Sequence, residues 1–260
     1  MLELDETMGN IKFFKMAMEK AKFSAPWMKK KECTSQQWNP YSFEGGTTAA
    51  IAGENFAIVG GDSRLTQSEV NILSRGADKI HLLNDSIILS SAGFCGDILQ
   101  LRRLLQLTSF FIIKARLHKY RFDYRGDMTV DLCAELLSRN LYYRRFFPYY
   151  TESILSGIDE NGKGAVFSYD SLGMLSPSPY AASGPGEPLI MPFFDCQISH
   201  VTLSDEVEKP ILSIERAISL MKDAFRMVTE REISTGDKMH LVIAEHDKPI
   251  RKLIVPLRED

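Results

Sequence analysis

Residues that could support acyl-transfer chemistry lie at the ends of predicted strands. Gly45-Gly46-Thr47-Thr48 opens one strand, Asp62 ends its hairpin partner, and Lys79 begins the next pair. A threonine hydroxyl can attack a carbonyl when its own α-amine acts as the base and a lysine lowers the local pKa. A backbone N–H at a glycine, here Gly93, can then donate to the oxyanion. This set predicts hydrolysis of an amide bond by an N-terminal threonine.

The sequence does not support the other common kinds of site. No G-x-G-x-x-G motif opens a helix, the glycine runs lack the lysine and spacing of a P-loop, and there is no G-x-S-x-G elbow. None of the five histidines is four residues from another, and the four cysteines form no CxxC pair. We therefore expect neither a metal site nor a cofactor.

Composition narrows the partners and the compartment. The 260 residues carry a net charge of −3, which gives no bulk attraction to nucleic acid or to an anionic membrane. The longest apolar runs fall far short of the roughly 20 residues that span a bilayer. Scattered cysteines suit a reducing compartment, and no secretory signal is seen. We expect a protein of the cytoplasm and nucleus.

Residues 1–44 differ from the rest of the chain. They combine a basic stretch of helical periodicity, Ile11 to Lys20, with the run Lys29-Lys30-Lys31 and a polar segment. We interpret them as an N-terminal extension that is surface-lying or flexible; a partner-binding or removable pro-segment is the alternative. The stripe is too short, and its start too acidic, to favour a membrane anchor. Residues 45–260 are predicted to form one domain.

Periodicity and turn residues predict the elements of that domain. Two hairpins come first, two helices follow from about Asp97 and Thr129, and a third hairpin turns at Asn161-Gly162. Ser176 to Pro179 reads as loop, a third helix covers about Ile211 to Arg231, and two strands close the chain. The predicted strands are Thr47–Ala52, Phe56–Gly61, Lys79–Leu83, Ser86–Ala92, Ser153–Ile158, Ala165–Tyr169, Met239–Glu245 and Arg251–Leu257.

The order of these elements predicts an α+β fold. Strands and helices are grouped rather than alternating, which argues against a doubly wound parallel sheet. Two antiparallel sheets packed face to face, with helices outside both, satisfy the pattern.

Several segments together resemble the β-type subunits of the 20S proteasome, from about Tyr41 onward, roughly four-fifths of the chain. They are most similar to a non-catalytic member that holds the sixth position of the β ring. The resemblance implies a four-layer αββα sandwich of the N-terminal-nucleophile hydrolase type. It also implies other α- and β-type subunits in stacked heptameric rings as partners, and polypeptide substrates in the chamber. The segments are Phe43–Thr48, Ala57–Arg64, Ser91–Asp97, Arg144–Tyr150, Gly162–Val166 and Ser234–Asp237.

The same resemblance locates the nucleophile position. In catalytic members the threonine lies sixteen residues before the aspartate matched by Asp62, and counting back sixteen gives Gly46. Glycine has no side chain that could attack a carbonyl. Thr47 is one place later, and a one-residue slip in a strand turns a side chain to the opposite face.

The supporting residues of the family are only partly present. Asp62 and Gly93 match, and Lys79 matches one residue further along than usual. Pro185 stands where a serine is expected. Glu232 and Thr235 stand for the aspartate and serine after the third helix. The alternative to a catalytic role for Asp62 and Lys79 is a structural ion pair at the strand ends.

We interpret the chain as a structural subunit that has lost activity. The alternatives are a threonine protease that uses Thr47 after self-cleavage, and an unrelated amidohydrolase. Arg144 to Tyr150, basic and aromatic, is predicted to be a subunit contact rather than an RNA site. The resemblance also implies that Asp170 helps to line the substrate pocket of an adjacent subunit; the alternative is that it caps a turn.

Overall fold

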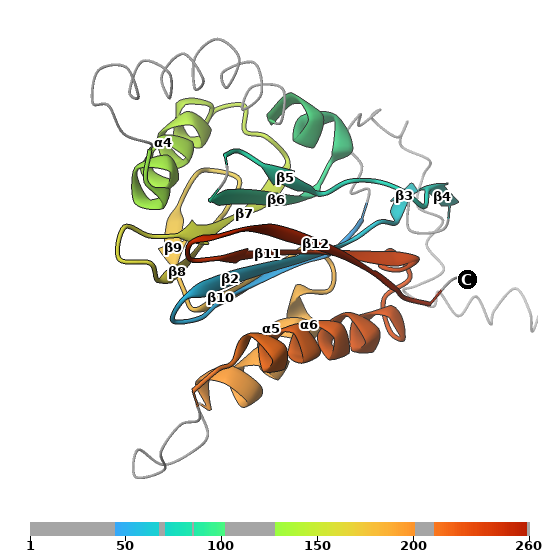
Figure 1. Ribbon diagram of the computed structural model, residues 1–260. Coiled ribbons are helices and arrows are strands. Elements are labelled where there is room, and N and C mark those ends of the chain that lie inside the picture. The colour runs from blue at the N-terminus through green and yellow to red at the C-terminus, as the bar shows by residue number, and fades with distance from the viewer. Residues whose placement is uncertain (1–44, 68–70, 85, 102–127, 201–210, 259–260) are drawn as a thin grey trace, which may run out of the picture. The chain divides into compact units, whose positions relative to one another are not determined.

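The structure is a computed structural model that describes residues 45–67, 71–84, 86–101, 128–200 and 211–258. In this part of the chain two antiparallel sheets pack face to face, with helices on both outer surfaces (Figure 1). The predicted four-layer αββα sandwich is therefore confirmed. The extension predicted for residues 1–44 lies outside the described residues, so the boundary at residue 45 stays a prediction.

The first sheet holds the strand that carries the residues around Gly46. Its strand order is β10-β1-β2-β11-β12, and each neighbouring pair is antiparallel. β1 and β2 form the predicted hairpin, with Thr48 opposite Gly61. The strands are β1 Thr48–Ala52, β2 Phe56–Asp62, β10 Tyr180–Ser183, β11 Lys238–Glu245 and β12 Lys248–Pro256.

The second sheet has the order β5-β6-β7-β8-β9, again antiparallel throughout. It consists of β5 Ile80–Leu82, β6 Ile87–Gly93, β7 Thr151–Ile158, β8 Gly164–Tyr169 and β9 Leu175–Pro177. A small separate hairpin, β3 Leu65–Gln67 with β4 Asn71–Ser74, follows β2.

Amphipathic helices cover the outer faces of both sheets. α4 Val130–Tyr143 packs on the second sheet and begins at Thr129, whose hydroxyl accepts from the backbone N–H of Leu132. On the first sheet lie α5 Glu187–Phe194, which continues into the π-helical turn η2 Asp195–Ser199, and α6 Ile214–Thr229. Residues 95–101 are also helical.

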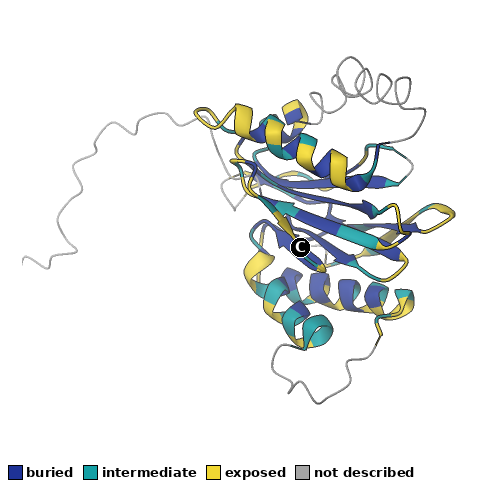
Figure 2. Ribbon diagram, turned by 90° about the vertical axis from the view of Figure 1, so that its left-hand side faces the viewer, coloured by how far each residue is buried: buried dark blue, intermediate teal, exposed yellow. Residues whose placement is uncertain are grey.

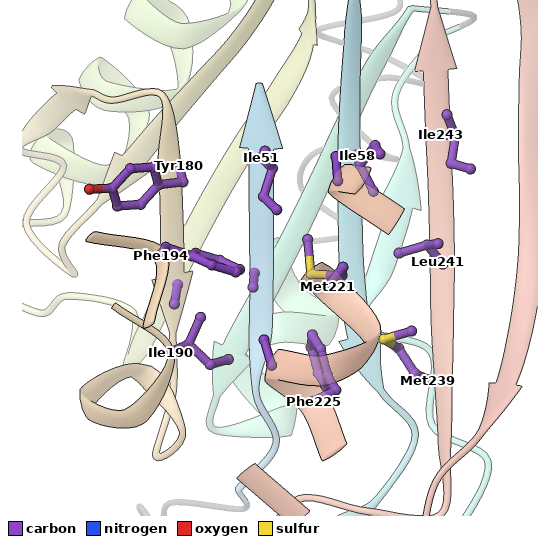
Figure 3. Close-up of a cluster of buried hydrophobic side chains, with 14 of the residues drawn as sticks. Ile51, Ile58, Tyr180, Ile190, Phe194, Met221, Phe225, Met239, Leu241 and Ile243 are labelled. Carbon is purple, nitrogen blue, oxygen red and sulfur yellow. The ribbon is translucent and has the colours of Figure 1, made fainter. Parts of the chain in front are cut away.

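Apolar side chains fill each of the three interfaces between layers. Between the first sheet and α5 and α6, residues such as Ile51, Phe194 and Phe225 are at most 1% exposed (Figure 3). Ile88 and Ile154 belong to the core between the sheets, and Leu137 and Leu155 to the core under α4. Burial is high along the inner strands, whereas the edge strand β12 and the outer faces of the helices are largely exposed (Figure 2). This burial is the main favourable term that holds the layers together.

The predicted strand pairs and helices are confirmed within a few residues. The errors lie in segments that were predicted to be loop. The prediction of a loop from Ser176 to Pro179 was wrong, because β9 includes Ser176 and Pro177. β9 is an edge strand, where a proline without an N–H is tolerated. The β3–β4 hairpin, β10 and α5 were also missed, because such short elements leave little periodicity to detect. The first helix begins at residue 95 rather than Asp97 and runs out of the described residues after 101.

Candidate functional site

Gly46 lies where the strands of both sheets end, beside Lys79. Its backbone has a φ of +91°, a conformation that favours glycine. A Cβ placed on Gly46 would lie only 1.8 Å from Nζ of Lys79. The ammonium group of Lys79 therefore occupies the space that a side chain at position 46 would need.

Lys79 and Asp62 form a buried ion pair. Nζ of Lys79 donates to Oδ1 of Asp62 at 2.6 Å and to the carbonyl oxygen of Arg64 at 2.6 Å. Asp62 also accepts from the backbone N–H groups of Thr47 and Gly236. Burial raises the pKa of Asp62 and lowers that of Lys79, while their mutual attraction opposes both shifts. Lys79 and Asp62 thus have the geometry expected of a structural ion pair at the strand ends.

The hydroxyl of Thr47 faces other partners. Its Oγ1 lies 2.7 Å from Oγ1 of Thr235 and accepts from the backbone N–H of Gly186 at 3.1 Å. Thr47 is 0% exposed. These bonds tie the start of β1 to the N-terminus of α5 and to the loop after α6. The hydroxyl is fully engaged in holding these segments together.

The remaining predicted residues lie around the same strand ends. Pro185 is flanked by Gly184, which packs against the carbonyl of Gly46, and by Gly186, which binds Thr47. Gly93 ends β6 with a φ of +121°. The carboxylate of Glu232 accepts from the hydroxyl and the backbone N–H of Ser234, rather than joining the Lys79 pair.

An arginine cluster next to this site was not predicted as such. Arg64 is 2% exposed, and its guanidinium donates to both carboxylate oxygens of Asp237. Arg75 binds the same carboxylate. Although burial alone would raise the pKa of Asp237, the hydrogen bonds from the two arginines lower it. Both Arg64 and Asp237 lie inside segments that carried the family resemblance, but no local pattern indicates that they pair.

The site holds positioned charges, and the groups that the sequence suggested for the chemistry are either absent or already hydrogen-bonded within the chain. Position 46 has no side chain, Lys79 already serves Asp62, and the Thr47 hydroxyl is buried and bonded. Nucleophilic catalysis needs a nucleophile within reach of a base and of the substrate.

Asp170 lies in the turn after β8, apart from Gly46. Its Oδ1 accepts from the backbone N–H groups of Leu172 at 2.9 Å and Met174 at 2.7 Å. Asp170 is exposed. The turn-capping role is therefore present in the structure, and a role toward a neighbouring subunit stays a prediction.

The segment from Arg144 to Tyr150 lies at the end of α4 and exposes large aromatic rings. Phe146 is 87% exposed, and the guanidinium of Arg145 stacks on its ring at 4.5 Å. Tyr149 differs from its neighbours, because it is 4% exposed and belongs to the core under α4. We define the aromatic surface as Tyr142, Tyr143, Phe146, Phe147 and Tyr150 with Arg145.

Two further findings concern membranes and metals. None of the helices in the described residues is both long and apolar enough to cross a bilayer. The same residues hold no group of three or more His, Cys, Asp or Glu side chains placed to bind a metal ion.

The fold and the polar cluster at its strand ends define an αββα sandwich of the N-terminal-nucleophile hydrolase class. The family described as "Proteasome subunit" matches residues 42–244, and the chain belongs to this family. It is 62% identical to proteasome subunit beta type-1 of Caenorhabditis elegans, over 95% of this chain and 93% of that protein. It is 40% identical to proteasome subunit beta type-1 of Arabidopsis thaliana, over 86% of this chain and 97% of that protein.

Proposed function

We propose that this chain is a non-catalytic, structural β-type subunit of the 20S core particle. It takes part in protein degradation by forming the β ring and by helping to shape the substrate pocket of an adjacent active subunit. The observation that carries the proposal is the geometry at Gly46. The nucleophile position has no side chain, and Nζ of Lys79 fills the space where one would lie. Relatives that carry the name beta type-1 match nearly the whole chain, which supports the same place in the ring.

Use of Thr47 as the nucleophile is the less favoured alternative. Cleavage after Gly46 would free its α-amine, but its hydroxyl would also have to leave Thr235 and Gly186. The strand would have to slip by one residue against β2 and β10, because Thr48 pairs with both Gly61 and Ser183. Such a slip turns each inward apolar side chain of β1 to the other face of the sheet.

The partners follow from this assignment. They are other α- and β-type subunits in stacked heptameric rings, with polypeptide substrates enclosed in the chamber. The aromatic surface is a candidate contact in that assembly, because exposed aromatic and arginine side chains are enriched at interface hot spots. Asp170 is a candidate contributor to the substrate pocket of an adjacent subunit. We place the particle in the cytoplasm and nucleus.

The test is intact-mass analysis of the chain in purified particles, combined with labelling by an epoxyketone inhibitor. We expect no labelling of this chain and no N-terminus at Thr47, while active subunits of the same particles serve as the labelling control. Trimming is expected upstream, within about residues 20–40, by a neighbouring subunit, because position 46 cannot cleave itself. A labelled chain that begins at Thr47 would contradict the proposal.

A further inference from the structure

An open cleft lies between the two sheets at the edge formed by β9 and β10. Its volume is about 370 Å³, and residues of β7, β8, β10 and α5 also line it. Three of these residues are carboxylates, Glu152, Asp170 and Glu187. Among the described residues that line the cleft, none carries a positive charge. The cleft is therefore acidic without an internal counter-charge.

Glu152 and Glu187 both line this cleft, and the charge of Glu152 acts on Glu187. Oε2 of Glu152 accepts from the backbone N–H of Gly184 at 3.1 Å and from the Ser183 hydroxyl at 3.4 Å, which fixes its position. Partial burial, and then the nearby negative charge of Glu152, raise the pKa of Glu187. A carboxylate in this situation is stabilised when an opposite charge arrives within about 4–6 Å.

A second, smaller cavity of about 110 Å³ shares Glu152 as part of its wall. Thr151 and Ser171 also line it. Thr151 is only 3% exposed, yet its hydroxyl has no hydrogen-bond partner among the described residues. A buried polar group without a partner is uncommon in a native structure, because it loses its hydrogen bonds to water and gains none in return. Thr151 thus adds an uncompensated buried hydroxyl next to Glu152, its neighbour along β7.

The walls of the larger cleft suit a long side chain with a charged end. Met174 and Met191 offer apolar contact for a methylene chain, and serine hydroxyls along β8 and β9 offer hydrogen-bond acceptors. Lysine and arginine bury their stems along apolar surface while their charged heads reach polar groups. A metal ion fits less well, because these carboxylates do not form a group that could hold one.

We propose that the cleft at Glu152 and Glu187 is a socket for a lysine or arginine side chain of an adjacent subunit. The inference rests on the proposed role as a subunit that acts by assembly. The basic side chain pairs with Glu152 and Glu187. A charge-assisted hydrogen bond between such groups is stronger than one between neutral groups.

The direct test is a cryo-electron microscopy map of the assembled particle that contains this chain. We expect an ammonium or guanidinium nitrogen of another subunit within 4 Å of a carboxylate oxygen of Glu152 or Glu187. A cleft that holds only solvent, or a neutral or acidic side chain, would overturn the inference and leave the assembly role intact. Absence of the chain from the particle would instead overturn the proposed function.

A competition experiment measures the effect of the charges. Wild-type chain and a Glu152→Gln, Glu187→Gln variant are co-expressed, particles are isolated through a tag on another subunit, and the two forms are quantified by mass spectrometry. We expect the variant to be incorporated at least about threefold less often. The matched control, Glu135→Gln with Glu160→Gln, makes the same charge change at two exposed positions and should compete equally.

A Glu187→Lys variant provides a second test in case the glutamate-to-glutamine substitutions disturb folding. It places a cation of the chain's own beside Glu152, so it should compete with the partner's side chain and reduce incorporation to at least the same extent. Equal incorporation of both variants and wild type would count against the socket.

Discussion

The polar cluster around Gly46 and the aromatic surface at the end of α4 differ in the burial of their side chains. In the cluster, Lys79, Asp62 and Thr47 are buried and each is hydrogen-bonded within the chain. On the aromatic surface, Tyr143 is 85% exposed and Phe146 87% exposed. The polar groups of the cluster are thus hydrogen-bonded within the chain, whereas the aromatic surface exposes a large apolar area to solvent.

This difference indicates what each region contributes. The buried ion pair of Lys79 and Asp62 holds strand ends together, and this structural role needs no substrate. The exposed aromatic side chains bury little of their apolar area within the isolated chain, so we expect their main contribution to come from contact with another molecule.

The largest expected effect comes from breaking the ion pair in the cluster. Lys79→Ala leaves the Asp62 carboxylate buried without its partner, and should lower the free energy of unfolding by about 3–5 kcal/mol. Chemical denaturation of the purified chain measures this. The control, Lys79→Met with Asp62→Asn, removes both charges and should cost clearly less. A single variant as stable as wild type would show that the cluster is not the structural unit described here.

A smaller effect is expected from restoring a side chain at the nucleophile position. Gly46→Ala must displace the Lys79 ammonium and adopt a positive φ, which costs on the order of 1–3 kcal/mol. The same denaturation measurement applies. For comparison, Gly76→Ala adds a methyl group where nothing lies within 4 Å, and should change stability far less. A stable Gly46→Ala chain would mean that Lys79 yields its place readily.

The aromatic surface should respond in assembly rather than in stability. Arg145→Glu with Phe146→Ala removes a stacked, exposed pair, so incorporation into particles should fall about 5- to 30-fold, equivalent to about 1–2 kcal/mol. Quantitative mass spectrometry of particles from co-expressed chains measures it. Tyr149 is left unchanged, because it is buried and its removal would disturb the core.

The matched control for that pair is Arg231→Glu with Ile233→Ala, which alters another exposed arginine and a nearby exposed apolar side chain. It should be incorporated normally. Equal incorporation of the two double variants would show that the aromatic surface is not part of the subunit interface. The contrast between the two regions would then be weaker.

The smallest effect is expected at Asp170. Asp170→Ala should leave assembly intact but weaken substrate cleavage by the adjacent active subunit roughly tenfold, if about 1.4 kcal/mol of a substrate hydrogen bond is lost. Kinetics with substrates that do and do not present a polar group to that pocket measure it. Unchanged kinetics across both groups would leave Asp170 with its observed turn-capping role alone.

Local patterns in the sequence were enough to predict the fold class. Alternating apolar residues and turn residues between β1 and β2 predicted the hairpin, and apolar spacing predicted α4 and α6, because these signals depend only on neighbours along the chain. They failed at β9 and β10, whose strand conformation comes from pairing with β8 and β1. Short segments carry too few residues for a period to be read.

For the candidate site too, some features follow from the sequence and others only from the tertiary structure. Counting residues back from Asp62 placed a glycine at position 46 without any structure, since residue types and spacing are properties of the sequence. Only the tertiary structure could place Nζ of Lys79 in the space beside Gly46, and join Thr47 to Thr235 from 188 positions away. Likewise, only folding brings Arg64 to Asp237, because such pairs depend on how whole layers pack, which no local pattern encodes.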